Sequence, residues 1–419
     1  MTEQPQQPGR TDSRCPPLNL VWMLTLEDKR KSTRRGSFIT KDAIPNRSVV
    51  EDNRIVDYLR SQGFTIGLAR TLIMNTDVFP ARIWLIDNSG SMNSADGHRV
   101  VTNASKKISN IACTRWEEVT STLLWHANFS AMMKAPTAIR LIHAPSLGQA
   151  QQVGIASSEH VDVRSEMTRL REVLRPKPCG SGGQLRHLRE IINSCLATPL
   201  GLLKENSMAI VYVTDRLPVD DDGKEGKEVT EKFVEVLSRL QGFPVWVVIR
   251  LSTDEQRVVD FYNEIDEKMS FVSIESLNPT GLIGSHVKLD ILDDYVSEAE
   301  NVNEHNPWLN YAYPLHLCKE SAVKFPVFDV LNDRPLQTQE LVDFCNLLFD
   351  RNQTAWALQP LPNPMTHYAD FRTEVLELNR RNGTLYNPIK RRVLPWIDMS
   401  QLDRAYGAQA STGCSCDIL

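Results

Sequence analysis

The chain has 419 residues, of which 41% are hydrophobic and 24% are charged. This is the composition of an ordinary globular protein, so a wholly disordered chain is excluded, and the length favours two or three structural units. With 47 Lys and Arg against 52 Asp and Glu, the net charge is −5. The overall basic surface typical of nucleic-acid-binding proteins is therefore absent.

Three features bear on where the protein resides. No stretch approaches the length of apolar sequence that crosses a bilayer, so we expect no transmembrane helix. The polar N-terminus lacks the apolar segment of a secretory signal. The eight cysteines show no disulfide spacing. We therefore expect reduced thiols in a cytoplasmic protein.

The N-terminal region is rich in Pro, Gln, Ser and Thr, which predicts a disordered tail over residues 1–48. A basic run at 29–35 is followed by Ser37. One interpretation is a solvated, flexible stretch. The other is a phosphorylation site at Ser37, because basophilic kinases favour two arginines just upstream. Residues 49–77 then show a helical spacing of apolar residues and predict a helical lead-in.

The sequence changes character at the apolar run 82–86, which predicts a buried parallel strand. A second such run covers residues 208–214. Between and after them the pattern predicts further strands at 137–143, 151–156, 244–251 and 270–275, and helices at 102–133, 161–175, 184–203, 227–241 and 253–267. This alternation predicts an α/β domain with a mostly parallel central sheet over residues 78–300.

After this domain, residues 288–302 and 337–350 predict helices, and no further strand is expected. We expect a helical and aromatic extension over 301–350 and a largely flexible tail over 351–419. The aromatic stretch 305–316 either packs against the domain or offers a surface to a partner.

A group of oxygen-bearing side chains follows the two most apolar strands. Asp87, Ser89 and Ser91 come directly after the first, in the pattern D-x-S-x-S, and Asp215 follows the second. Parallel strands release their carboxyl ends at one edge of a sheet, so both carboxylates are expected there. Ligation by oxygen alone suits Mg²⁺ or Mn²⁺ rather than Zn²⁺.

An apolar strand followed by D-x-S-G-S, with a later strand ending in Thr214–Asp215, resembles the metal-ion-dependent adhesion site of von Willebrand factor type A domains. The resemblance covers roughly residues 78–300. It implies a three-layer, Rossmann-like fold and a Mg²⁺ or Mn²⁺ ion held by Asp87, Ser89, Ser91 and Asp215. It also implies a protein–protein interaction module, because the ion's open position takes an acidic group from a protein partner.

The chain departs from that family at two places. The family's loop reads P-x-G-x-T-P-L, and its threonine, a metal ligand, falls on Gly182 here. Ser181, one residue earlier, could supply a hydroxyl instead. The glycine that usually follows the second aspartate is replaced by Arg216. Two functions are therefore open: a metal-dependent interaction module, or a scaffold with the same fold and no metal.

Two further alternatives concern the same residues. Asp87 or Ser89 could simply cap the helix that follows the strand. A Mg²⁺-dependent phosphohydrolase could use Asp87 as its nucleophile, although a D-x-D motif would be expected there and Ser89 and Ser91 are not acidic. Nucleotide-binding and hydrolase motifs are absent. We therefore expect a binding protein rather than an enzyme.

The C-terminus carries an independent signal. The last four residues, Cys416 to Leu419, match the C-a-a-X pattern, and the terminal leucine favours geranylgeranylation of Cys416. Cys414 could carry a palmitoyl group as the second anchor that stable membrane attachment needs. The alternative is an unmodified polar tail. Lipidation would place the protein on the cytoplasmic face of a membrane.

Overall fold

The computed structural model describes residues 49–102, 108–145, 149–157, 162–198, 207–275, 288–351 and 360–407. The predicted N-terminal tail with Ser37, and the C-terminal residues 408–419 with Cys414 and Cys416, lie outside this range. Among the described residues, no helix is long and apolar enough to cross a membrane.

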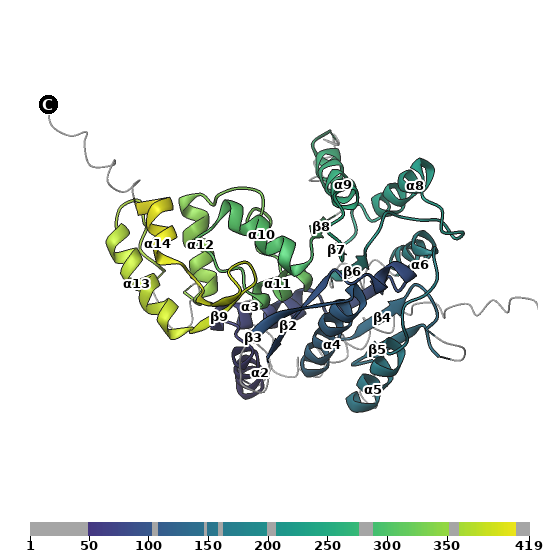
Figure 1. Cartoon of the computed structure of the whole chain (residues 1–419), viewed down its shortest axis with the longest axis horizontal. Helices are drawn as coiled ribbons and strands as arrows, with labels where there is room; N and C mark the ends of the chain where they lie inside the picture. The colour runs from purple at the N-terminus through teal and green to yellow at the C-terminus, as the bar shows by residue number, and fades with distance from the viewer. Residues whose placement is uncertain are drawn as a thin grey trace, which may run out of the picture.

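A six-stranded sheet forms the centre of the molecule (Figure 1). Its strands are β1 (Ala81–Ile86), β4 (Thr137–Leu141), β5 (Gln152–Ile155), β6 (Met208–Thr214), β7 (Val245–Leu251) and β8 (Lys288–Leu292). They lie in the order β5-β4-β1-β6-β7-β8, and only the edge strand β5 is antiparallel to its neighbour. The sheet grows outward in both directions from β1 and β6, so the switch point of this doubly wound sheet lies between those two strands.

Helices cover both faces of the sheet and give three layers. One face packs on α4 (Arg115–Met133) and α5 (Val163–Leu174), through residues such as Trp84 and Ile86 of β1. The other packs on α6 (Gln184–Ala197), α8 (Lys227–Ser238) and α9 (Gln256–Glu275), through Ile83 and Leu85. Every residue of β1 is buried because both faces are covered, as expected for a continuous apolar run. The predicted mostly parallel α/β architecture is confirmed.

The segment before α4 differs from the prediction. Residues expected to begin a helix at 102 belong instead to a hairpin of β2 (Gly97–Thr102) and β3 (Ile108–Cys113). The helix starts only at Thr114, where a capping box fixes its first turn: the Thr114 hydroxyl accepts the Glu117 N–H, and the Glu117 carboxylate accepts the Thr114 N–H. The β-branched residues of the hairpin favour strands over helix.

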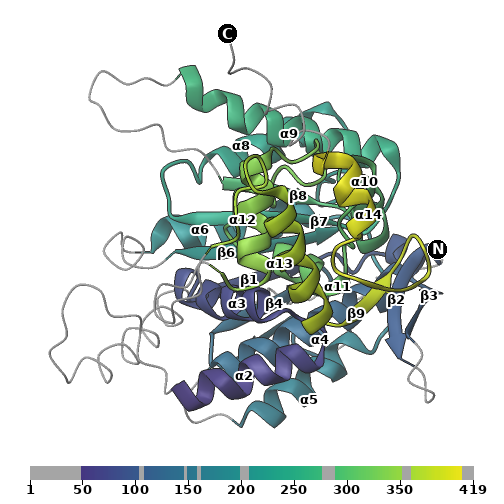
Figure 2. The same ribbon diagram turned by 90° about the vertical axis from the view of Figure 1, so that its left-hand side faces the viewer.

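The predicted lead-in and extension, far apart in sequence, form one helical unit with a shared apolar core. It contains α2 (Val49–Ser61), α3 (Ile66–Val78), α10 (Tyr295–His305), α11 (Tyr313–Glu320) and α12 (Thr338–Leu348). A Cβ atom on Gly67 of α3 would lie only 1.7 Å from the carbonyl oxygen of Leu347. Helices α3 and α12 therefore meet at backbone distance, where only glycine fits. In Figure 2 this unit faces the viewer, in front of the sheet.

Residues 360–407 are folded, although the sequence predicted a largely flexible tail. They form α13 (Tyr368–Arg381), the hairpin of β9 (Thr384–Asn387) and β10 (Arg392–Pro395), α14 (Met399–Leu402) and a π-helical turn (Asp403–Gly407). A few apolar residues, among them Phe371, Val375 and Trp396, insert into the core of the helical unit. These apolar residues are widely spaced in a polar sequence and show no clear helical or strand period. The sequence therefore did not predict these elements.

Two other boundaries also differ from the prediction. Residues 270–275 end α9 and are not a strand, while residues 288–292 are strand β8 rather than the start of a helix. Strand β8 pairs with β7, which lies in a distant segment of the sequence. Local periodicity carries no information about such a contact. The helix predicted there begins later, at α10, where Asp294 caps its first turn.

A buried group of charges joins the helical unit to the sheet. Arg250 of β7 is 2% exposed and forms ion pairs with Glu118 of α4 and Glu320 of α11. Glu320 also accepts a 2.9 Å hydrogen bond from His126 of α4. Arg250, Glu118 and Glu320 belong to three different elements. Their ion pairs therefore fix how β7, α4 and α11 lie against one another.

We expect Arg250→Met to destabilise the protein by about 3–5 kcal/mol, because it leaves two buried carboxylates without their cation. Chemical denaturation measures the change. The control is Arg381→Met, which breaks an exposed pair with Glu377 and should have little effect. Equal stability of the two variants would contradict a structural role for Arg250.

Candidate metal site at the carboxyl edge of the sheet

The two predicted carboxylates do lie together. Asp87 follows β1 and Asp215 follows β6, and Ile86, the last residue of β1, is the register partner of Val213, the second-last residue of β6. The Asp87 N–H donates to the Val213 carbonyl at 2.9 Å. Asp87 is 0% exposed and Asp215 2% exposed. The structure thus places both carboxylates at the switch point of the sheet, the position where ligands of doubly wound folds bind.

The two serines complete a compact set of oxygens. Ser89 Oγ lies 3.1 Å from Ser91 Oγ, and Ser91 Oγ donates to Asp215 Oδ1 at 2.9 Å. An octahedral Mg²⁺ ion with ligands at about 2.1 Å requires neighbouring ligand oxygens about 3 Å apart. Ser91 Oγ has that spacing to each of the other two oxygens, and all three are of the hard type that Mg²⁺ and Mn²⁺ prefer. The residues present therefore fit such an ion.

Asp87 orders the turn that carries the serines. Its Oδ1 accepts the Ser89 N–H at 2.9 Å, an Asx turn. Its Oδ2 accepts Gln184 Nε2 at 2.7 Å and the Thr214 hydroxyl at 3.3 Å. Ser89 begins a short 3₁₀ turn at Gly90–Asn93 but makes no side-chain cap. Simple helix capping by Ser89 is therefore not what the structure shows.

A cation that the sequence analysis missed lies at this site. Arg115, the first residue of α4, donates from Nη1 to Asp215 Oδ2 at 2.9 Å. The same guanidinium donates from Nε and Nη2 to the two oxygens of Asp96, at 2.7 and 2.5 Å. Arg216, which was predicted beside the site, pairs instead with Glu225 at 3.4 Å.

Burial and the charge of Asp87 raise the pKa of the Asp215 carboxyl above its usual value, while the hydrogen bonds from Arg115 and Ser91 act in the opposite direction. Asp215 is thus a buried carboxyl beside a second carboxyl, and a neighbouring cation favours its ionised form. In the structure Arg115 supplies that charge.

The loop at the position of the family's threonine has no room for a threonine side chain. Gly182 has φ +100°, and a Cβ atom there would lie 2.7 Å from both the Asp220 carbonyl oxygen and the Gly223 nitrogen. Ser181 is exposed, and its hydroxyl lies beside Gly223. Within the described residues it makes no hydrogen bond to the other predicted ligands. The structure brings together Asp87, Ser89, Ser91 and Asp215, but not Ser181.

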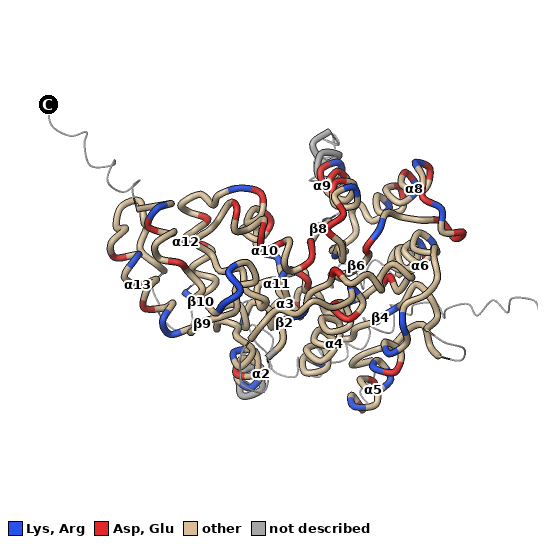
Figure 3. The backbone as a smooth tube through the Cα atoms, in the orientation of Figure 1, with Lys and Arg blue, Asp and Glu red and all other residues tan. Residues whose placement is uncertain are grey.

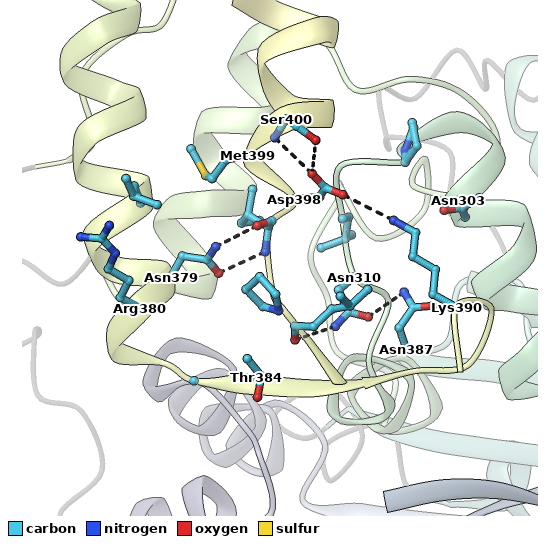
Figure 4. A pocket seen from close by; sticks show the side chains of 17 residues that line it. Asn303, Asn310, Asn379, Arg380, Thr384, Asn387, Lys390, Asp398, Met399 and Ser400 are labelled. Carbon is cyan, nitrogen blue, oxygen red and sulfur yellow. Dashed lines mark hydrogen bonds and ion pairs between the residues drawn. The ribbon is translucent and has the colours of Figure 1, made fainter. Parts of the chain in front are cut away.

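The helical unit contains a separate pocket of about 530 Å³, which the sequence analysis did not predict (Figure 4). Four asparagines line it, and three of them hold neighbouring segments together. Asn310 donates to the carbonyls of Leu385 and Leu394, Asn387 donates to Asn310, and Asn379 pairs with the backbone of Ile397. These amides already have partners, so they explain how the β9–β10 hairpin is fixed and do not by themselves indicate a ligand.

An acidic cleft of about 600 Å³ lies between α9, β8 and α10. Acidic residues are frequent along these elements in Figure 3. Burial raises the pKa of Asp293 to about 7 and that of Asp266 to about 6, and neighbouring acidic groups add to both shifts. No group of three or more His, Cys, Asp or Glu side chains suited to a metal occurs in the described part of the chain.

We expect Gly182→Thr, which restores the family's residue, to destabilise the protein by about 2 kcal/mol or more. The new side chain would meet backbone atoms at a positive φ. The matched control is Ser181→Thr at the adjacent exposed position, which should unfold at nearly the wild-type denaturant concentration. If Gly182→Thr were as stable as its control, the steric explanation for the missing threonine would be wrong.

The acidic cleft predicts a pH dependence of stability. The folded-state pKa of Asp293 is raised to about 7 from a usual value near 3.8. The folded state therefore holds the proton more tightly, and stability is lost as pH rises from about 4 to 7. We expect Asp293→Asn to raise the unfolding free energy at pH 8 by about 1–2 kcal/mol and to change it little at pH 4. A pH-independent effect would show that charge is not the cause.

Comparison with known proteins assigns the chain to no family. No protein-family model matches the chain, and no curated protein matches it. The features that bear on function are therefore the motif at Asp87–Ser91, the strand end at Asp215, and their neighbours in the fold.

Proposed function

We propose that this protein is an interaction module of the von Willebrand factor type A kind, whose site binds Mg²⁺ or Mn²⁺ and, through it, a protein partner. Ser89, Ser91 and Asp215 would hold the ion, with Asp87 behind them. The observation that supports this most directly is that Ser91 Oγ lies about 3 Å from both Ser89 Oγ and Asp215 Oδ1.

The arrangement of the sheet agrees with this proposal. Asp87 follows the first strand, β1, and Asp215 follows β6, which is the fourth strand of the central sheet in chain order. The resemblance places the family's two metal loops after those same two strands. The three layers of the domain and the single antiparallel edge strand β5 are compatible with a Rossmann-like fold of this type.

Binding requires no chemical step from the protein. A bound divalent ion would supply positive charge to attract a carboxylate of the partner. Asp87 shapes the turn so that both serine hydroxyls point to one place, and Gln184 holds Asp87 in that position. Ser91, which is half-buried, joins this turn to the strand end at Asp215. The partner is thus expected to be a protein with an exposed acidic residue.

A metal-independent scaffold of the same fold is the second candidate. It is favoured by the contact of Arg115 with Asp215, because the carboxylate already has a cation, and by the absence of a hydroxyl at Gly182. A phosphohydrolase is disfavoured. Asp87 is fully buried, and both of its oxygens accept hydrogen bonds, so it is poorly placed to attack a phosphorus atom.

The proposal predicts that millimolar Mn²⁺ or Mg²⁺ raises the thermal unfolding temperature. An ion at a hundred times its dissociation constant stabilises the folded state by about 2.7 kcal/mol. Ser91→Ala removes one ligand oxygen and should abolish the shift. The matched control is Asp221→Asn, on the exposed turn nearby, which should leave the shift unchanged.

The outcomes separate the two candidates. A metal-dependent shift that Ser91→Ala removes and Asp221→Asn preserves supports the metal site. A shift that persists in Ser91→Ala places the ion elsewhere. If the ion has no effect on any variant, the metal-independent scaffold is the better description, and partner binding should then resist chelation by EDTA.

A further inference from the structure

We propose that Arg115 is a built-in competitor of the divalent ion, which binds more weakly as long as the guanidinium contacts Asp215. This inference deepens the proposed function and rests on it. Arg115 would then set the affinity of the site for metal, and through it the availability of the site to an acidic partner.

The competition follows from how closely the two cations would lie. Arg115 Nη1 is 2.9 Å from Asp215 Oδ2, and Ser91 Oγ is 2.9 Å from Oδ1 of the same carboxylate. An ion that binds Ser91 and Oδ1 at about 2.1 Å would lie roughly 5–6 Å from the guanidinium. The N-terminus of α4, where Arg115 begins the helix, adds its own partial positive charge. Both cations therefore use one buried carboxylate.

Asp96 gives Arg115 a second place to bind. It lies just before β2 and accepts two hydrogen bonds from Arg115, from Nε and from Nη2. Its side chain is 41% exposed, whereas that of Asp215 is fully buried. If Arg115 leaves Asp215, it loses one hydrogen bond and keeps the paired, two-point contact with Asp96. The guanidinium can thus shift toward Asp96 without being left unpaired.

The start of α4 limits this movement to the side chain. The capping box between Thr114 and Glu117 fixes the first turn, and the Arg115 N–H donates to the Ser94 carbonyl at 3.0 Å. The backbone of Arg115 therefore stays in place whether or not its side chain contacts Asp215. The competition requires a change of side-chain position only, and no rearrangement of the fold.

Two substitutions should move the metal affinity in opposite directions. Arg115→Gln removes the competing charge and should lower the Kd for Mn²⁺ by about tenfold, the factor expected for a single and a double charge about 6 Å apart with water-like screening. Asp96→Asn removes the alternative partner of Arg115, which should then hold Asp215 more firmly, so the Kd should rise several-fold.

The experiment is titration of the full chain with Mn²⁺, following free Mn²⁺ by electron paramagnetic resonance. Ser91→Ala serves as the variant that should not bind. The matched control is Arg186→Gln, an exposed arginine that pairs with Asp221 and should keep the wild-type Kd. Arg115→Lys keeps the charge, so it should bind Mn²⁺ nearly as the wild type does. Thermal unfolding without metal checks that each variant folds.

Each result has a distinct meaning. Tighter binding in Arg115→Gln, or binding in that variant alone, supports competition. Equal Kd values for wild type and Arg115→Gln, with no binding by Ser91→Ala, overturn competition and leave the proposed metal site intact. No binding by any variant overturns both. Equal tightening in Arg115→Gln and Arg186→Gln would reduce the effect to general surface charge and also overturn competition.

Discussion

The contact on which the architecture most depends is the buried ion pair network of Arg250. A guanidinium that is 2% exposed can be ionised in the interior only because Glu118 and Glu320 lie against it. These three residues belong to a strand, a helix of the sheet domain and a helix of the helical unit. The network therefore does more than stabilise one layer. It requires the two parts of the molecule to meet in one orientation.

The same network reaches the candidate site through α4. Glu118 binds Arg250 with one carboxylate oxygen and accepts the N–H of His98, in β2, with the other. Arg115 lies one turn earlier on this helix and contacts Asp215. Helix α4 is thus held at Glu118 by the core and presents its first residue, Arg115, to Asp215. A carboxylate that joins the parts of the fold thus also helps to fix the position of Arg115 beside the proposed metal site.

The sequence was informative where an interaction is local or where burial is complete. The continuous apolar runs at β1 and β6 predicted two buried strands, and the strand ends at Asp87 and Asp215 predicted that two carboxylates would meet. The sequence could not indicate Arg115, because its contact with Asp215 joins residues 100 positions apart. The segment 360–407 was missed for a related reason: its few core residues bury themselves against helices that lie far away in the chain.

The two departures from the family's pattern have the same effect on the site. At Gly182 the loop passes so close to the backbone of Asp220 and Gly223 that a threonine does not fit. The site therefore lacks one neutral ligand oxygen, while at Asp215 it has gained a cation, Arg115. A missing oxygen and an added positive charge both weaken the attraction for a divalent ion. Ser91 Oγ nevertheless keeps a distance of about 3 Å to both Ser89 Oγ and Asp215 Oδ1, the spacing that such an ion requires. Of the two buried carboxylates, Asp215 has Arg115 as its cation, while Asp87 accepts hydrogen bonds from the neutral groups of Ser89, Gln184 and Thr214. A second cation beside them would offset the cost of burying the other charge. Under the proposed function, the arrangement is a weak metal site whose occupancy Arg115 sets.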